Sequence, residues 1–161
     1  MRGLLAAVLL ALAALPARAA SVSWTGAAAG DWDVGTNWSG GIVPGAADDV
    51  SIAGAFVVAY ATDPVLAVNS LTLGAGATLA VSTGIAVSSY VEVQSGGVLQ
   101  ADAAVGLDAG DFDLRAGSSL SYAGAPAAPS PSLSLVVSGA FTLEAGATAT
   151  VAGTGYAGGA H

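Results

Sequence analysis

Apolar residues alternate with small or polar residues in four stretches of the chain, and each stretch has a glycine near its centre. The stretches are residues 70–81, 90–101, 111–122 and 140–151. They align without gaps on the pattern x-h-x-h-x-s-G-s-x-h-x-h, where h is apolar and s is small, with the shared glycines Gly76, Gly96, Gly117 and Gly146. Apolar residues two apart lie on one face of a strand, and glycine permits a tight bend. Each stretch therefore predicts two short strands joined by a corner.

The first strand of each stretch carries one apolar pair and the second strand another. The pairs are Leu71/Leu73, Val91/Val93, Phe112/Leu114 and Phe141/Leu143, then Leu79/Val81, Val98/Leu99, Leu120/Tyr122 and Ala149/Val151. A third short alternation follows in three places, at Ile85/Val87, Val105/Leu107 and Leu135/Val137. Three strands in about 20 residues is the period of a repeat architecture whose stacked units bury one another's apolar face.

The fold class predicted from this pattern is all-β, a right-handed parallel β-helix (β-solenoid), with the hand taken from the rule for parallel crossovers. One alternative is Ala- and Gly-rich disorder, against which four copies of an alternating pattern argue. The second alternative is an antiparallel β-sandwich. The strands lack the Asn-Gly and Asp-Gly hairpin signals that such a sandwich would favour.

The first 19 residues resemble a secretory signal peptide. Met1 and Arg2 are followed by an apolar run from 4 to 15, and Ala17 and Ala19 suit the positions before a cleavage site. The run is too short to span a bilayer comfortably, although a buried helix or an uncleaved anchor is an alternative. We therefore expect a secreted protein, extracellular or at the cell surface, with no membrane insertion after the signal is removed.

The predicted organisation has four parts. They are a signal peptide at 1–19, a Trp-rich N-terminal cap at 20–49, β-solenoid coils at 50–152 with a Pro-rich loop insertion at 123–131, and a Gly-rich tail at 153–161. The insertion holds three prolines, which cannot join a ladder of hydrogen bonds.

Composition excludes several classes of function. The 161 residues include 38 Ala and 23 Gly, no Cys, no Lys, and a single His at position 161. The missing cysteines exclude disulfides and thiol chemistry, and one histidine leaves little for a metal centre or a catalytic triad. The sequence pI is near 4.1, which argues against nucleic acid and anionic lipid as partners because both require a basic surface. We expect no cofactor and no enzymatic activity.

All three tryptophans lie in the segment before the repeats. The string is Trp24-Thr25-Gly26, Gly30-Asp31-Trp32, Asn37-Trp38, Val43-Pro44-Gly45 and 48–52 (DDVSI). It resembles the N-terminal segment of many secreted bacterial β-helix proteins, including autotransporter-like and filamentous surface proteins. The resemblance implies the stacked architecture of pectin-lyase-like and adhesin-like proteins, and it implies no catalytic residues for this chain.

Two roles are open for Trp24, Trp32 and Trp38. Large aromatic rings cover the exposed end of a first coil efficiently, so we expect them to form a cap. Asp31, Asn37, Asp48 and Asp49 would then bond backbone N–H groups in the turns of this cap. Alternatively, exposed Trp rings would stack on a surface glycan. Asn37 also begins an Asn-Trp-Ser sequon, which matters only in a glycosylating host.

Asp108, Asp111 and Asp113 are a weak candidate Ca²⁺ site, because carboxylate oxygens suit this ion. A solvated acidic turn is the competing interpretation. Arg115 lies near Asp113 and is expected to form a surface ion pair with it.

The expected function is an exported structural module, a stalk, display or adhesion element that forms the N-terminal part of a longer protein. The alternative is a carbohydrate-binding or carbohydrate-active β-helix module. The last repeat, residues 140–151, shows no cap, so we expect self-association through its open strand edge.

Overall fold

The computed structural model describes residues 19–62, 64–102, 105–122 and 133–151. The predicted signal peptide apart from its last residue, the Pro-rich insertion and the Gly-rich tail lie outside the described residues.

The described chain consists of short β-strands and one turn of 3-10 helix, η1 (Gly35–Asn37). The strands are β1 (Ser21–Ser23), β2 (Ala29–Asp31), β3 (Asp49–Ile52), β4 (Val57–Tyr60), β5 (Leu66–Val68), β6 (Ser70–Leu73), β7 (Thr78–Val81), β8 (Ile85–Val93), β9 (Val98–Ala101), β10 (Val105–Leu114), β11 (Ser119–Tyr122), β12 (Leu133–Val137), β13 (Phe141–Leu143) and β14 (Thr148–Val151). The all-β prediction is confirmed.

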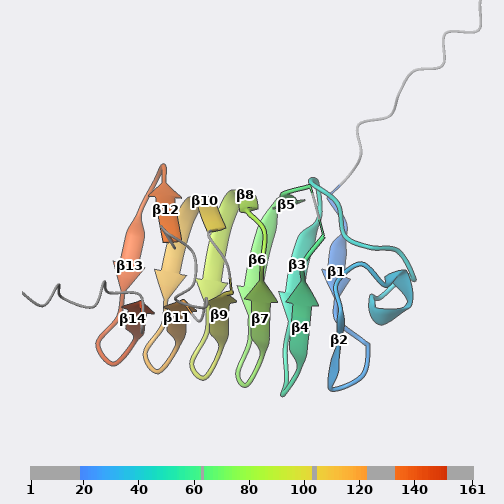
Figure 1. Cartoon of the computed structure of the whole chain (residues 1–161), viewed down its shortest axis with the longest axis horizontal. Helices are drawn as coiled ribbons and strands as arrows, with labels where there is room; N and C mark the ends of the chain where they lie inside the picture. The colour runs from blue at the N-terminus through green and yellow to red at the C-terminus, as the bar shows by residue number, and fades with distance from the viewer. Residues whose placement is uncertain (1–18, 63, 103–104, 123–132, 152–161) are drawn as a thin grey trace, which may run out of the picture.

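The strands form two sheets, one of eight strands and one of six, and successive repeats add strands to both (Figure 1). The first sheet has the order β1-β3-β6-β8-β10-β12, with β5 also paired to β8 and β13 also paired to β10. The second has the order β14-β11-β9-β7-β4-β2. All pairings between these named strands are parallel, which argues against the antiparallel β-sandwich.

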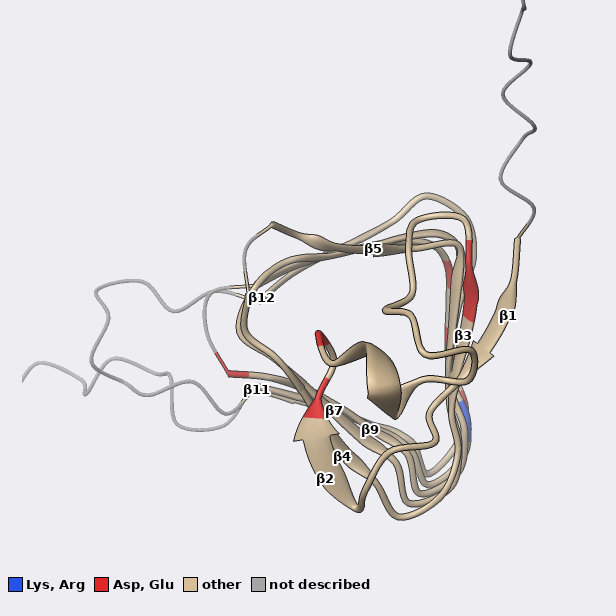
Figure 2. Ribbon diagram, turned by 90° about the vertical axis from the view of Figure 1, so that its right-hand side faces the viewer, with Lys and Arg blue, Asp and Glu red and all other residues tan. Residues whose placement is uncertain are grey.

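The chain passes from one sheet to the other and back, and so winds around a common axis (Figure 2). We call one such passage a coil. Strands β8 and β10 are long because each turns a corner. The start of β8 pairs with β5, whereas its end pairs with β6. The third alternation predicted at Ile85/Val87, Val105/Leu107 and Leu135/Val137 lies in these corner-turning strands and in β12, as expected.

Residues that align in the repeats are also paired between neighbouring coils. Phe112 pairs with Val91 of the preceding coil and with Phe141 of the following one. Equivalent inward positions therefore stack into apolar columns, with strands about 4.8 Å apart. Most of these side chains are at least nine-tenths buried, including Val50, Ile52, Leu71, Leu73, Leu79, Val93, Leu99, Leu114 and Leu120.

One predicted apolar pair was assigned to the wrong positions. Val98 was paired with Leu99, but the structure buries Leu99 and Ala101 and leaves Val98 partly exposed. Neighbouring residues of a strand point to opposite faces, so Val98 and Leu99 cannot both face inward.

The first complete coil begins at Asp49, beside the predicted start of the solenoid, but it does not carry the glycine pattern of the four aligned stretches. Strands β3, β4 and β5 stack on β6, β7 and β8 in the same register as the later coils. Their corner has a glycine at Gly54, whereas the position that aligns with Gly76 is Ala55. The predicted cap segment 20–49 also contributes β1 and β2 to the two sheets, and its last residue begins β3.

Candidate functional site

The three tryptophans pack against one another at the N-terminal end of the stack. The ring centroids of Trp24 and Trp38 are 5.0 Å apart at 89°, and those of Trp32 and Trp38 are 4.5 Å apart at 64°. Trp32 also contacts Tyr60 of the first complete coil, with centroids 6.3 Å apart. Edge-to-face pairs of this kind add to the stabilisation that the buried area provides. The cluster thereby joins the N-terminal segment to the stacked coils.

The indole rings are too buried to offer a stacking surface to a sugar. Their exposed fractions are 5% for Trp24, 0% for Trp32 and 2% for Trp38. The Trp38 Nε1–H donates to the Trp32 carbonyl at 2.7 Å, and the Trp24 Nε1–H donates to the Ala27 carbonyl at 3.2 Å. Burial of all three rings favours the cap over the glycan platform.

The segment around η1 also closes the outer edge of β1. Ser39 N–H donates to the Ser23 carbonyl at 2.8 Å, and the Ser39 hydroxyl accepts from Ser23 N–H at 2.9 Å. Trp24 and Trp38 form an isolated antiparallel bridge beside them. Figure 2 shows η1 lying across the end of the stack. On the outer edge of β1, Ser23 is therefore bonded to the protein itself through both its N–H and its carbonyl.

Two of the polar residues expected to bond backbone N–H groups in this segment behave differently, one as an acceptor and the other as a donor. Asp48 does so, accepting from Gly45 N–H at 2.8 Å and Ala20 N–H at 3.2 Å. Asn37 acts as a donor instead, from its Nδ2 to the Asp31 carbonyl at 3.1 Å. The Asn37 amide of the sequon is thus engaged within the fold.

Asp49 bonds side chains of the next coil rather than backbone. It accepts from the Ser70 hydroxyl at 2.6 Å and from Asn69 Nδ2 at 2.7 Å. These bonds lower the pKa of Asp49 below its ordinary value, that from Ser70 most and that from Asn69 next. The hydroxyl that carries the first bond belongs to a buried serine, 2% exposed. The network joins the first complete coil to the second.

Two of the three Ca²⁺ candidates, Asp111 and Asp113, bond to groups of this chain. Asp111 accepts from Ala140 N–H at 2.8 Å, and Asp113 pairs with Arg115. Asp108 lies outward in β10 rather than in a preceding turn. In the described part of the chain, no group of three or more His, Cys, Asp or Glu side chains could hold a metal ion. Asp111 and Asp113 face outward, whereas Phe112 and Leu114 face inward.

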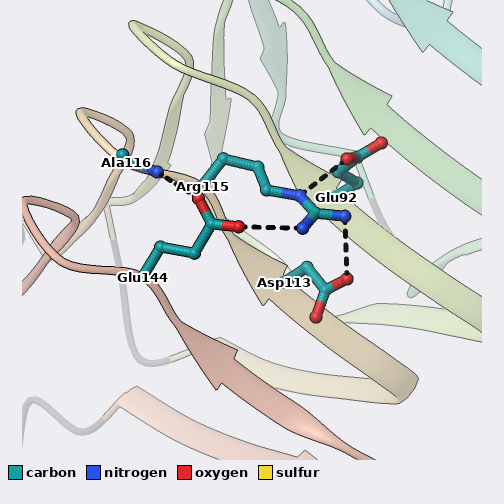
Figure 3. A network of polar contacts seen from close by, with 5 residues as sticks. All are labelled: Glu92, Asp113, Arg115, Ala116 and Glu144. Carbon is teal, nitrogen blue, oxygen red and sulfur yellow. Dashed lines mark hydrogen bonds and ion pairs between the residues drawn. The ribbon is translucent and has the colours of Figure 1, made fainter.

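Arg115 makes more contacts than the expected pair with Asp113 (Figure 3). Its Nε donates to Glu92 and its Nη1 to Glu144, both at 2.9 Å, whereas the contact from Nη2 to Asp113 is longer, at 3.4 Å. Glu144 also accepts from Ala116 N–H at 2.9 Å. One guanidinium therefore bridges three successive coils.

The charges in this network compensate one another. Glu92 and Asp113 are direct cross-strand neighbours, an arrangement that destabilises a sheet unless a cation lies between them. The hydrogen bond from Arg115 lowers the pKa of Glu144 most, and the hydrogen bond from Ala116 N–H lowers it next. In turn, the hydrogen bonds that Arg115 donates to Glu144 and Glu92 raise the pKa of Arg115. The bonding of Arg115 across the coils was not predicted, because Glu92 and Glu144 are 23 and 29 residues away.

The last coil differs from the others in the exposure of its apolar side chains. Phe141 and Leu143 are 47% and 50% exposed, whereas their register partners Phe112 and Leu114 are 1% and 0% exposed. Phe141 stacks on Phe112 with ring centroids 5.9 Å apart. Its other side has no coil upon it among the described residues.

Two surface hollows are lined in part by acidic side chains. One of about 350 Å³ lies beside Asp31 and Asp33, and one of about 290 Å³ lies beside Ser88, Asp108 and Ser138. Their linings combine these groups with apolar or backbone surface, and neither lining holds a histidine or a lysine.

No protein-family model matches the chain, and comparisons with curated proteins and with solved structures find no match either. Within the described residues, no helix has the length and apolar character needed to cross a membrane.

Proposed function

We propose that the chain is a right-handed parallel β-helix that serves as an exported structural module, a stalk, display or adhesion element that begins a longer rod. The observation that carries this proposal is the in-register stacking of coils that are closed by tryptophans at the N-terminal end. Parallel strands linked by crossovers adopt the right hand almost without exception. Such a stack lengthens in one direction without changing its cross-section.

The use of the acidic residues supports a structural role over a catalytic one. A catalytic carboxylate has to be free to take or release a proton at its substrate. Seven of the ten described acidic side chains instead accept hydrogen bonds or ion pairs from this chain, namely Asp48, Asp49, Glu92, Asp102, Asp111, Asp113 and Glu144. They fix turns and join neighbouring coils.

Export is supported by the leader-like residues 1–19 and by a surface with few charges. The resemblance of the Trp-containing string to secreted bacterial β-helix proteins points to the same destination. Only 9% of all residues are charged and the chain has no lysine, which suits a module held outside the cell rather than one that binds anionic polymers.

Expression of the full chain in a Gram-negative host, followed by N-terminal sequencing of the protein outside the inner membrane, tests the proposal. We expect the exported protein to begin at Ala20. A chain that keeps residues 1–19 and remains in the cytoplasm would contradict export.

A glycan array with the mature protein tests the structural role against carbohydrate binding. We expect no binding that depends on the indoles. Glycan binding that is lost in Trp32→Ala, with the fold retained and with binding intact in the exposed control Val34→Ala, would favour a carbohydrate-binding module.

A further inference from the structure

We propose that the C-terminal edge of the stack, formed by β13, β14 and the corner at Gly146, is a directional docking face for one further parallel coil of the same repeat pattern. This inference rests on the proposed function and names what binds at the open end of the stack. The occupant is a segment with the pattern x-h-x-h-x-s-G-s-x-h-x-h, whose strands pair in parallel with β13 and β14.

The first support is the interface that the chain already makes with itself. Each coil covers the apolar column of the one before it, in one register throughout the repeats. At the edge, Phe141 and Leu143 present the same column half-exposed. A segment that places two apolar residues at this spacing would bury them as Phe141 and Leu143 bury Phe112 and Leu114.

The second support is a ladder of hydrogen bonds along the glycine corner. Gly76 N–H donates to the Gly96 carbonyl at 3.1 Å, Gly96 N–H to Gly117 at 3.0 Å, and Gly117 N–H to Gly146 at 3.1 Å. All four glycines have positive φ, between 78° and 89°. The ladder has one direction: every N–H points toward the following coil.

Gly146 ends this ladder with its donor directed out of the stack. Its carbonyl accepts from Gly117, and its N–H has no acceptor among the described residues. A coil with a left-handed glycine at the same corner would offer the carbonyl that Gly146 N–H needs. Few other residues adopt that conformation without strain.

The register also directs the strand edge outward. Phe112 N–H donates to the Ala140 carbonyl of the next coil. Phe141 occupies the equivalent position in β13, so its N–H points to the open side. Exposed N–H and C=O groups of this kind are a template for another strand.

The N-terminal end of a second copy does not fit this face. Its β1 edge is bonded to Ser39 and its apolar end is covered by the buried indoles. A head-to-tail chain of copies would have to expel that cap. The remaining mode for a second copy, edge against edge in antiparallel orientation, is an outcome that the experiment below detects.

The test inserts a second copy of residues 82–101 between Val151 and Ala152 of the full chain. Val151 has the same register as Tyr122, Ala101 and Val81, so the 20 inserted residues follow it as they follow Val81. They supply the third alternation (Ile85/Val87), the two strands of one aligned stretch and a corner glycine. The matched control carries Val91→Ser, Val93→Ser and Leu99→Ser in the inserted copy alone, which keeps the length and the corner.

Hydrogen exchange at the amides of Phe141, Leu143 and Gly146 is the measurement. We expect the insertion to slow their exchange by about tenfold or more, because they gain acceptors, and the control to leave it unchanged. Equal exchange in the two insertions would overturn the proposal. If the insertion fails to fold, the same 20 residues added in excess as a peptide to the unmodified chain must protect these amides, and no protection overturns the proposal.

Sedimentation of the unmodified chain separates the second copy from the coil. Protection of the three amides in a dimer that is lost on dilution would mean that a second copy occupies the edge, and it would overturn the proposal. Failure of docking leaves cleavage after Ala19 and the glycan array unaffected, so the proposed function can stand without this inference.

Discussion

The two ends of the stack solve the same physical problem differently. At the N-terminal end three indoles, at most 5% exposed, cover the first coil, and Ser39 bonds the edge of β1. At the C-terminal end Phe141 and Leu143 are about half exposed, and the glycine ladder ends in an N–H group. Parallel coils without a cap would expose a strand edge and an apolar column at both ends, so the difference in cover arises from the residues that precede the repeats. Closure at one end and openness at the other add to the direction that the glycine ladder already has.

The largest expected effect comes from opening the closed end. Trp32→Ala removes a side chain that is 0% exposed and contacts both Trp38 and Tyr60. We expect the free energy of unfolding to fall by about 3–5 kcal/mol, measured by urea denaturation. Ile42→Ala, at a residue 75% exposed, is the control and should change it little. Equal losses in both variants would mean that the indole cluster does not hold the end closed.

The same substitution at two register-paired phenylalanines compares the interior with the open end. Phe112→Ala creates a cavity between coils and should cost about 3–5 kcal/mol of unfolding free energy. Phe141→Ala, at a residue 47% exposed, should cost about 1 kcal/mol, because only half of its surface is buried. Urea denaturation of both variants gives the difference, and equal losses would show that the last coil is covered in solution.

Substituting the corner glycine with alanine should lower the free energy of unfolding by a similar amount in an inner coil and in the last coil. Gly117→Ala and Gly146→Ala each force a Cβ into a left-handed conformation, with φ of 79° and 89°. We expect a loss of about 1–2 kcal/mol of unfolding free energy in each, because this strain is local. Ala116→Gly, at the neighbouring position, is a control without that strain. A loss at Gly117 alone would indicate that the last corner relaxes.

The smallest expected effect concerns the ion network between the last three coils. Glu144 has a lowered pKa in the folded state, so its contribution to stability is present above its ordinary pKa of 4.5 and is lost as the pH falls through the folded value. Arg115→Gln should therefore lower the melting temperature at neutral pH, and the difference from the unmodified chain should shrink on acidification. Gln94→Ala, in the same outward column, should show no such pH dependence. A difference that is independent of pH would remove the ion network from the explanation.

Sequence reasoning could reach the parts of this fold that repeat. Glycines at a fixed place in four stretches identified the corners, and alternation identified the strands, because both signals are local. The first complete coil falls within the predicted solenoid segment but outside the four aligned stretches, because Ala55 stands where the other coils have glycine. Strands β1 and β2 were missed because three residues each are too short to show alternation.

The contacts between coils could not be predicted in the same way. The bonds from Arg115 to Glu92 and Glu144 depend on the register of strands more than 20 residues apart. The proximity of Asp108, Asp111 and Asp113 in sequence suggested a metal site, but two of the three are bonded to neighbours that only the fold supplies. The cap interpretation of the tryptophans implies buried indoles, whereas the contact between Trp32 and Tyr60 depends on how residues 20–49 lie over the stack.

Hydrogen exchange along the whole chain tests the asymmetry of the two ends most directly. The outward amide of Ser23 in β1, which donates to Ser39, should exchange about as slowly as the amides of β3, although β1 is an end strand. The outward amides of β13 should exchange far faster than those of β10. Equal exchange rates for the Ser23 amide and the outward amides of β13 would contradict a stack that is closed at one end and open at the other.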